Sequence, residues 1–297
     1  MDISKKDLAL PESLVDYELV DSGNGRKLER FGNHLISRPD SQAIWGVSSK
    51  ELWRETYASF EAGKDGLKGD WKFSGGNSGK GDVKSWEIKF KEYKFKVKPT
   101  PFRHLGIFPE QAPHWELAEA KLKKAGGGKV LNLFGYTGAA SIVCAKAGAK
   151  VTHVDASAPS MEWAKENQIL NGLPKDSIRW ICDDALKFVR REVKRGNKYE
   201  GIIVDPPKFG RGANGEVWKL EENILELMQI CGELLSDNAS FIILTVYATD
   251  ISAVSIANLL NSVAGKNNLN LEYGELISKE SSSRGFELVH AIYARLV

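Results

Sequence analysis

The chain has 297 residues, which is too long for one average domain and suits one large α/β domain with a smaller companion. Apolar residues make up 42% and charged residues 27% of the chain, a composition that excludes a disordered protein. The formal net charge is only +2, from 41 basic and 39 acidic residues, so any attraction to nucleic acid must come from a local patch.

Cysteine usage and hydropathy exclude further classes of protein. The three cysteines, Cys144, Cys182 and Cys231, lack metal-ligand spacing, so we expect no metal site, no disulfide framework and a reducing compartment. The first 20 residues carry charges where a signal peptide needs an apolar core, and no apolar run of 18 residues occurs. We expect a soluble, cytoplasmic protein that does not bind membranes.

The N-terminal part of the chain predicts a small β-rich domain over residues 1–105. In WEIKFKEYKFKVKP, residues 86–99, apolar residues and lysines alternate on both sides of a Lys91-Glu92 turn, which predicts a β-hairpin with one apolar face. The glycine-serine stretch at 73–82 predicts a loop. A helix is predicted over 111–125, ending at three glycines, so the second domain covers 106–297.

Strand and helix patterns alternate from Lys129 onward. Strands are predicted at 129–135, 150–156, 178–185 and 199–205, and helices at 139–148, 160–172 and 186–195. This alternation predicts right-handed βαβ units and a parallel sheet. Ligands of such sheets bind at the carboxyl ends of the strands, so the residues that follow each strand form the candidate site.

Glycines and acids follow the first three of these strands. Gly135 and Gly138 come before a helix N-terminus, where backbone can approach a ligand closely. Asp155 lies roughly 20 residues beyond Gly135, the spacing at which an acid meets ribose hydroxyls, and Asp183 and Asp184 could accept from adenine. Each residue alone also suits a turn glycine or a helix cap. Their recurrence at equivalent strand ends, without G-x-G-x-x-G, favours an adenosine-bearing cofactor that has no phosphates to repel.

The fourth strand ends in a different way. In IIVDPPKFGRG, residues 202–212, the apolar run stops at Asp205, and Pro206 and Pro207 cannot continue a strand ladder. The pattern predicts a buried strand followed by a stiff, exposed turn, a place where function is often displayed.

Four motifs, VLNLFGYTGAAS, VTHVDAS, CDDA and IIVDPPKF, resemble those of class I S-adenosylmethionine-dependent methyltransferases. The resemblance is closest to the bacterial branch that methylates bases of large-subunit ribosomal RNA, and it covers about residues 101–250. It implies a Rossmann-like, seven-stranded mixed sheet with helices on both faces, in which 271–278 and 287–297 form the last, antiparallel pair. It also implies S-adenosylmethionine as the cofactor. The first hundred residues do not resemble the RNA-binding domain usual in that branch.

The resemblance implies roles for the residues at the strand ends. The glycine loop would approach the methionine moiety, the acid after the second strand would hold the ribose hydroxyls, and the acid after the third would read adenine. In the lead-in segment HLGIFPEQ, residues 104–111, an aromatic residue and a glutamine would close over the cofactor. The cofactor-binding residues implied are Phe108, Gln111, Phe134, Gly135, Thr137, Gly138, Asp155, Ala156, Asp183, Asp184, Ala185 and Asp205.

In base methyltransferases a turn of the type D-P-P-x lies beside the transferring methyl group. The catalytic residues implied are Asp205, Pro206, Pro207 and Lys208. The prolines would hold the Asp205 carboxylate where a base nitrogen can donate to it. The substrate-binding residues implied are Lys208, Phe209 and Arg211, with Phe209 in place of the stacking aromatic that follows the prolines in amino-methylating relatives.

The cysteines bear on the atom that is methylated. Carbon-5 methylation of cytosine needs a cysteine nucleophile, and neither the proline turn nor the fifth strand, at 240–250, contains one. Cys144 and Cys182 are predicted within a helix and a strand interior, where cysteine is usually buried and inert. We therefore favour nitrogen methylation of RNA, most of all ribosomal RNA. Carbon-5 methylation, a protein or small-molecule substrate, and a cofactor-binding pseudoenzyme remain open.

Three basic segments are candidates for RNA contact. They are the hairpin lysines Lys89, Lys94, Lys96 and Lys98, the helix at 187–195 and the loop at 280–286. Each is more often a solvated surface than a binding site. Only coincidence with the mouth of the cofactor site would favour binding.

Overall fold

The structure is a computed structural model that describes residues 3–63, 68–74, 85–212, 215–247, 249–263, 265 and 269–297. It contains two compact units, each built from separate stretches of chain. The large unit comprises Met1–Leu8, Pro113–Leu276 and Ala291–Val297, and the small unit comprises Ala9–Ala112 and Ile277–His290. The division of the chain into domains at residue 105 stays a prediction. Most of the glycine-serine loop expected at 73–82 lies outside the described residues.

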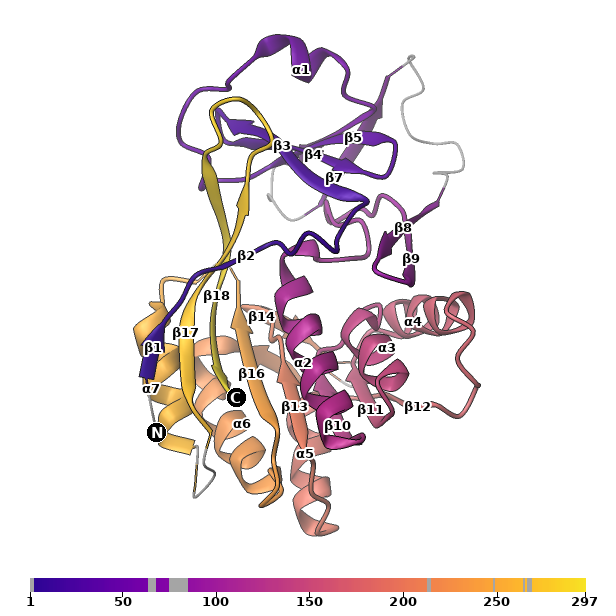
Figure 1. The fold of residues 1–297 in the computed structure, drawn as a ribbon, viewed down its shortest axis with the longest axis vertical. Helices are drawn as coiled ribbons and strands as arrows, with labels where there is room; N and C mark the ends of the chain where they lie inside the picture. Colours follow the sequence, from indigo (N-terminus) through magenta and orange to yellow (C-terminus); the bar gives the residue numbers. More distant parts are fainter. Residues whose placement is uncertain are drawn as a thin grey trace. The chain divides into compact units, whose positions relative to one another are not determined.

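The large unit is built on a mixed sheet. In the described residues its order is β1-β17-β18-β16-β13-β10-β11-β12, with β2 paired to β17 (Figure 1). Its strands are β1 (Ile3–Lys5), β2 (Leu8–Ala9), β10 (Gly128–Leu133), β11 (Ala149–Asp155), β12 (Ile178–Cys182), β13 (Gly201–Val204), β16 (Phe241–Val246), β17 (Leu271–Lys279) and β18 (Glu287–Leu296). The strands β10, β11, β12, β13 and β16 pair in parallel, and β18 is antiparallel to β16.

This sheet confirms the expected seven strands and extends them. The two short strands β1 and β2, from the first nine residues, add to the edge at β17, and β1 pairs with it in parallel. The sequence pattern did not predict this extension. The change of direction in strand order falls between β10 and β13, because β11 and β12 follow β10 on one side and β13 lies on the other. Open α/β sheets bind ligands at such a point.

Among the described residues, four helices begin and end within two residues of the predicted ranges, and three further helices were not predicted. They are α1 (Lys50–Arg54), α2 (Ala112–Ala125), α3 (Ala139–Lys146), α4 (Ala158–Leu170), α5 (Ala185–Lys194), α6 (Leu220–Leu234) and α7 (Ala253–Val263), with a 3-10 turn at Pro109–Gln111. Ser157 and Asp184 cap α4 and α5 by accepting from the amides of Ser160 and Lys187. Glycines with positive φ end the same two helices, Gly172 at 62° and Gly196 at 68°.

Strand alternation divides the core of the large unit between the two faces of the sheet. Leu131, Val204 and Leu244 are fully buried and belong to a cluster with apolar residues of α5, α6 and α7. The other face of β10 to β12 meets α3 and α4. This face carries buried polar side chains, among them Asn132 and His153, which lie under the candidate site.

The small unit is β-rich, as expected. One sheet has the order β3 (Tyr17–Gly23), β4 (Arg26–Phe31), β5 (His34–Pro39), β6 (Ala58–Ala62) and β7 (Gly69–Phe73). A second, two-stranded sheet is the predicted hairpin, β8 (Trp86–Phe90) with β9 (Tyr93–Val97), in antiparallel register. Its apolar positions are largely buried and Lys89 and Lys94 are exposed, so the alternation prediction is confirmed.

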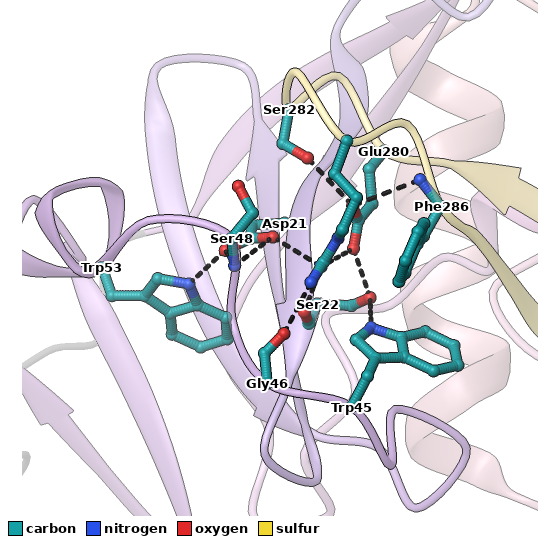
Figure 2. Close-up of polar contacts among 10 residues, drawn as sticks. Asp21, Ser22, Trp45, Gly46, Ser48, Trp53, Glu280, Ser282 and Phe286 are labelled. Atoms are coloured by element: carbon teal, nitrogen blue, oxygen red, sulfur yellow. Dashed lines mark hydrogen bonds and ion pairs between the residues drawn. The ribbon is translucent and has the colours of Figure 1, made fainter.

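A buried polar network within the small unit fixes the loop at 280–286 (Figure 2). The Arg284 guanidinium donates to the carboxylates of Asp21 and Glu280, at 3.0 and 2.6 Å, and to the carbonyls of Gly46 and Ser22. Asp21 is 0% exposed and Glu280 4% exposed, so both depend on this arginine. The donors of Arg284 are therefore used internally, which makes the loop a weaker candidate for RNA contact through its arginine.

Among the described residues no helix is both long enough and apolar enough to cross a membrane. Within the same residues, no three His, Cys, Asp or Glu side chains gather in an arrangement that could hold a metal ion.

Candidate active site at the carboxyl edge of the sheet

Parallel register brings the four predicted strand ends to one edge of the sheet. Leu133, the last residue of β10, is the partner of Val154 on one side and of Val204 on the other. Asp155 is the partner of Cys182 at the end of β12. The segments 134–138, 155–157, 183–185 and 205–208 therefore start from the same edge.

The segment 134–138, the glycine loop, has an unusual backbone. Phe134 and Tyr136 are in the left-handed region with φ of 56° and 52°, although neither is glycine, and Gly138 has φ of 84°. Such conformations cost roughly 1 to 3 kcal/mol each and persist only where surrounding contacts impose them. The contacts here include a hydrogen bond from Gly135 N to Val154 O of 3.1 Å and one from Asn167 Nδ2 to Thr137 O of 3.0 Å.

A buried imidazole forms the floor of the glycine loop. A Cβ atom on Gly135 would lie 2.3 Å from His153 Cε1, so only glycine fits above this ring. His153 Nδ1 lies 2.9 Å from Ser141 Oγ, which also accepts from Asn132 Nδ2 at 2.9 Å. Burial lowers the pKa of His153 to about 3, so the ring is neutral at physiological pH. Its Nε2 atom has no hydrogen-bond partner among the described residues.

Asp155 joins the glycine loop to the start of α4. Its Oδ2 accepts from Tyr136 N at 2.9 Å and its Oδ1 from Ser157 N at 2.8 Å. Burial raises the pKa of this carboxyl, and the two amide donors oppose the rise. Each carboxylate oxygen has lone pairs beyond these single bonds, so the group can still accept from two hydroxyls of a ligand.

The two acids after β12 have different surroundings. Asp183 forms an ion pair with Arg191 of α5, and its Oδ1 accepts from Asp184 N at 2.8 Å. Asp184 caps α5, with Oδ1 accepting from Lys187 N at 2.8 Å. The adjacent Asp183 amide donates to Asp155 O at 3.2 Å, which ties this segment to the one after β11. Ala185 begins α5 and is buried.

The proline turn is anchored by an aromatic side chain that is distant in sequence. Strand β13 ends at Val204, one residue before the predicted stop, and Asp205 follows it half-buried. Trp218 is 4% exposed, donates from Nε1 to the Pro207 carbonyl at 2.7 Å, and lies with its ring centroid 5.0 Å from that of Phe134. One indole thus contacts both the proline turn and the glycine loop.

A short hairpin leads away from the proline turn. It consists of β14 (Phe209–Arg211) and β15 (Val217–Lys219), paired antiparallel. Lys208 is exposed, and its carbonyl accepts from Leu220 N at 3.0 Å. Its ammonium is 3.9 Å from the carboxylate of Asp250.

The family model of S-adenosylmethionine-dependent methyltransferases matches residues 77–261. The chain belongs to this family. The strand order of the sheet, the glycine loop and the acids at the strand ends agree with that match. The protein is therefore an S-adenosylmethionine-dependent methyltransferase, and S-adenosylmethionine is its cofactor.

Three relatives describe how far the similarity extends. The structure of a SAM-dependent methyltransferase from Agrobacterium tumefaciens is 40% identical, covers 99% of this chain and 92% of its own, and has a TM-score of 0.89. The structure of SMU.776 in complex with SAH has a TM-score of 0.71 over 96% of this chain and 76% of its own, and at 18% identity it shows the fold alone. A ribosomal RNA large subunit methyltransferase K/L from Shewanella frigidimarina is 36% identical over 165 residues, which are 54% of this chain but only 22% of that protein.

The residues at the sheet edge fit this cofactor. The half-buried Asp155 carboxylate retains acceptor capacity, as ribose hydroxyls require. The glycine loop has no side chain at Gly135 and turns through left-handed residues, so its backbone is open to a close ligand. Asp183 and Asp184 add acceptors for an amino group.

The two other predicted cofactor residues belong to the small unit. Phe108 precedes the 3-10 turn, with its ring centroid 5.0 Å from that of His104, and Gln111 ends the turn and is buried. Burial and the neighbouring Arg38 and Arg103 lower the pKa of His104 to about 3. Their contact with the cofactor stays a prediction.

The basic helix named as a candidate for RNA contact is α5 with the residue that follows it, and its basic side chains pair with acids of the large unit. Its ion pairs are Lys187 with Glu216, Arg190 with Glu226, Arg191 with Asp183, and Arg195 with Glu192. The acids Glu216, Asp183 and Glu192 are only 13%, 24% and 0% exposed, so their pairs exchange for phosphate less readily than fully exposed pairs do. The helix is therefore a weaker RNA candidate than its sequence indicates.

The prediction for the cysteines is correct for Cys144 and wrong for Cys182. Cys144 is buried in α3, and burial raises the pKa of Cys144 and that of Cys231 to about 12. Cys182 is exposed, because it is the last residue of β12 at the edge of the sheet and not an interior position. Its Sγ lies 3.9 Å from Ala156 O.

Sequence patterns missed several residues of the site. His153 lies two positions before Asp155 in β11. A polar residue inside a buried strand usually has a specific hydrogen-bond partner, and this was the signal that could have identified it. Trp218 contacts Pro207, which lies 11 positions away in the sequence, and Arg191 contacts Asp183, which lies 8 positions away. No local pattern marks such pairs.

Proposed function

We propose that this methyltransferase transfers its methyl group to a nitrogen of a base in ribosomal RNA, in the cytoplasm. The observation that carries the proposal is the Asp205-Pro206-Pro207 turn, which starts from the same sheet edge as the glycine loop and is fixed by Trp218. The name of the Shewanella relative supports ribosomal RNA as the substrate class. The matched residues make up 22% of that relative.

The cofactor site is proposed residue by residue. Phe134, Gly135, Thr137 and Gly138 would line the methionine moiety with backbone atoms. Asp155, followed by Ala156, would accept from the two ribose hydroxyls. This assignment is supported by the two amide donors that fix the Asp155 carboxylate.

Adenine would be read by the segment after β12. Asp184 has one carboxylate oxygen committed to the Lys187 amide, which leaves the other for the adenine amino group. Ala185 can donate its backbone amide, because the first amides of a helix have no partner within it. Asp183 would support this segment through Arg191. Phe108 and Gln111 are proposed to close over the cofactor from the lead-in segment.

Asp205 is the proposed base-contacting acid. The bound cofactor supplies an activated methyl group on a sulfonium, so the protein needs to orient the nucleophile and accept a proton. We assign the Asp205 carboxylate and the Pro206 carbonyl to the base, beside the Pro207 carbonyl that accepts from Trp218 Nε1. The fixed φ of the two prolines limits movement of these groups. After transfer, the proton of the methylated nitrogen would pass to Asp205 or to water.

The position of Cys182 argues against carbon-5 chemistry. The sheet order places β11 and β10 between β12 and β13, so the ends of β12 and β13 are about 14 Å apart at the usual strand spacing. A thiol at the end of β12 cannot attack a ring held at Asp205. The other two cysteines are buried.

Nucleoside mass spectrometry tests the proposal. Ribosomal RNA from a strain that lacks the protein is incubated with the purified enzyme and labelled S-adenosylmethionine. A new nitrogen-methylated base is the expected product, and Asp205→Ala should abolish it. A carbon-5 methylated cytosine, or label only in protein or small molecules from the same extract, would contradict the proposal. Absence of any label despite cofactor binding would indicate a pseudoenzyme.

A further inference from the structure

The hairpin β14–β15 presents one exposed face made of four side chains. Residues directly opposite in an antiparallel pair lie on the same face, and so do residues two apart along a strand. The register pairs Phe209 with Lys219 and Arg211 with Val217, so these four side chains share a face. Phe209 and Val217 are each 53% exposed, and Arg211 and Lys219 are also exposed.

The opposite face anchors the hairpin to the site. Gly210 pairs with Trp218, whose buried indole donates to the Pro207 carbonyl and packs against Phe134. A Cβ on Gly210 would lie 3.4 Å from Pro207 Cγ, so the strand runs close to the proline ring. The exposed face therefore has a fixed position beside the residues proposed to hold the target base.

The chemistry of this face suits nucleotides. The Arg211 guanidinium lies 6.0 Å from the centroid of the Phe209 ring, and within the described residues no carboxylate lies within 4.0 Å of it. Phenylalanine rings and arginine planes are the surfaces on which unpaired bases stack. Lys219 is 2.8 Å from Glu222, but both side chains are at least half exposed, and such surface pairs are weak enough to exchange for phosphate.

We propose that this face, formed by Phe209, Arg211, Val217 and Lys219, binds the single-stranded nucleotides next to the target base. Phe209 and Val217 form the stacking surface, Arg211 stacks on an adjacent base or pairs with its phosphate, and Lys219 contacts the backbone. The inference rests on RNA as the substrate and specifies how the RNA is recognised beyond the methylated base.

The size of the face favours RNA over a protein partner. Two paired strands of three residues span about 10 Å by 5 Å, whereas stable protein interfaces bury roughly 800 Å² on each partner. Four-stranded RNA-binding sheets stack two or three bases, so a surface of half that width suits about one or two. A second copy of the chain is thus the weaker candidate and becomes an outcome of the test.

Direct binding is the first measurement. A fluorescein-labelled single-stranded RNA of about 12 nucleotides, within the usual range of single-strand site sizes, is titrated with the full chain in the presence of S-adenosylhomocysteine. Phe209→Ala should weaken binding about 5- to 150-fold, the span of one lost stacking contact. Val217→Ala should weaken it less. If Arg211 contacts a phosphate, Arg211→Lys should bind RNA more tightly than Arg211→Ala does. If Arg211 stacks on a base, the two variants should bind RNA equally weakly.

Matched controls separate the proposed face from exposed apolar surface in general. Val254→Ala on α7 and Leu225→Ala on α6 remove side chains that are 52% and 53% exposed elsewhere in the large unit, and both should bind RNA as the parent does. S-adenosylhomocysteine affinity, measured by calorimetry, should be unchanged in all variants, which verifies folding. Sedimentation of the parent protein checks the competing occupant: dimerisation abolished by Phe209→Ala would assign the face to a second copy and overturn the proposal.

Methylation distinguishes failure of this inference from failure of the proposed function. If the parent protein methylates ribosomal RNA and the Phe209→Ala, Val217→Ala double variant binds and methylates it equally well, the hairpin face is not the binding surface. If the parent methylates only protein or small molecules, the substrate assignment fails and this inference with it. The expected result is a raised KM for RNA in the double variant, with the KM for the cofactor unchanged.

Discussion

Asp155 Oδ2 accepts a hydrogen bond of 2.9 Å from the amide of Tyr136, a residue held in the left-handed backbone region. The carboxylate after β11 thus stabilises the strained loop after β10. The same group is proposed to hold the ribose. Removal of the Asp155 carboxylate should therefore weaken cofactor binding in two ways: the ribose contact is lost, and the glycine loop is no longer held in place.

Asp155→Ala should weaken binding of S-adenosylhomocysteine by about 1 to 3 kcal/mol, because charge-assisted hydrogen bonds to the ribose are lost. Calorimetry measures the change. Asp237→Ala, which removes an exposed acid from the turn before β16, is the control and should bind normally. NAD should give no heat with the parent protein. Binding of NAD alone would overturn the assignment of this sheet edge to the methionine-derived cofactor.

Gly135→Ala should lower both cofactor affinity and stability, because the new Cβ would lie 2.3 Å from the His153 ring. Overpacking of this kind costs typically about 1 to 3 kcal/mol. The double variant Gly135→Ala, His153→Ala removes the clash and should recover part of the affinity relative to the single glycine variant. Calorimetry and thermal unfolding measure the two effects. If His153→Ala gives no recovery, the imidazole is not the floor that requires glycine.

The same histidine makes the stability of the large unit sensitive to acid. Burial lowers the pKa of His153 to about 3 in the folded protein, whereas an unfolded histidine has a pKa near 6.5. The unfolded state therefore binds the proton first, so the contribution to stability is complete above about pH 6.5 and is lost as the pH falls toward 3. The expected loss is about 1.4 kcal/mol per pH unit within that window.

His153→Gln should flatten this acid dependence. Burial also lowers the pKa of His114 in the same unit, so the parent and the variant will both lose stability in acid. The diagnostic quantity is the difference between the two curves of unfolding free energy against pH, from urea titrations at pH 7, 6 and 5. Parallel curves would show that His153 takes up its proton at the same pH in the folded and the unfolded protein, which would contradict the prediction.

Replacing all three cysteines by alanine or serine should leave methyl transfer largely intact. Cys144 and Cys231 are buried, so their replacement costs stability, whereas Cys182 is exposed and should tolerate serine well. Activity is therefore compared among variants that retain cofactor binding. A folded Cys182→Ser protein without activity would restore the carbon-5 mechanism, despite the distance between β12 and β13.

Local patterns were sufficient for the four parallel strands β10 to β13 and for the edge where the site lies. A strand such as β13 is a short apolar run that stops at a polar residue, and a helix such as α4 ends in glycine, so each is marked by its own residues. Parallel register then gathers the strand ends without further information. The positions of Asp155 and Asp205 at that edge follow from these two steps.

The remaining parts of the site depend on contacts that sequence spacing does not encode. The Trp218 indole reaches Pro207 only after the chain has turned through a hairpin, and β1 pairs with β17 across more than 260 positions. Cys182 is exposed because β12 is the edge strand of the sheet. The sequence of β12 alone does not show that the strand lies at an edge. Interactions between distant segments decide all three.

Asp205→Asn should reduce turnover by roughly 10² to 10⁴-fold, the usual span of a general acid or base contribution. Asparagine keeps the size of the side chain and one acceptor oxygen, so a purely structural role in the turn would leave the rate nearly unchanged. The prediction follows from a carboxylate that orients the base nitrogen and receives its proton. Cofactor affinity and the melting temperature should change little, because the loss is confined to the transition state.

Single-turnover methylation of ribosomal RNA at saturating S-adenosylmethionine measures the chemical step directly. Asp250→Asn is a matched control, since this acid is fully exposed and lies 3.9 Å from the neighbouring Lys208. It should retain the parent rate. Equal rates for Asp205→Asn and the parent would exclude proton acceptance by Asp205. Asp205→Ala would then test whether residue 205 positions the base. A slow alanine variant and a fast asparagine variant would together show that the side chain positions the base through a hydrogen bond, with the prolines holding the acceptor in place.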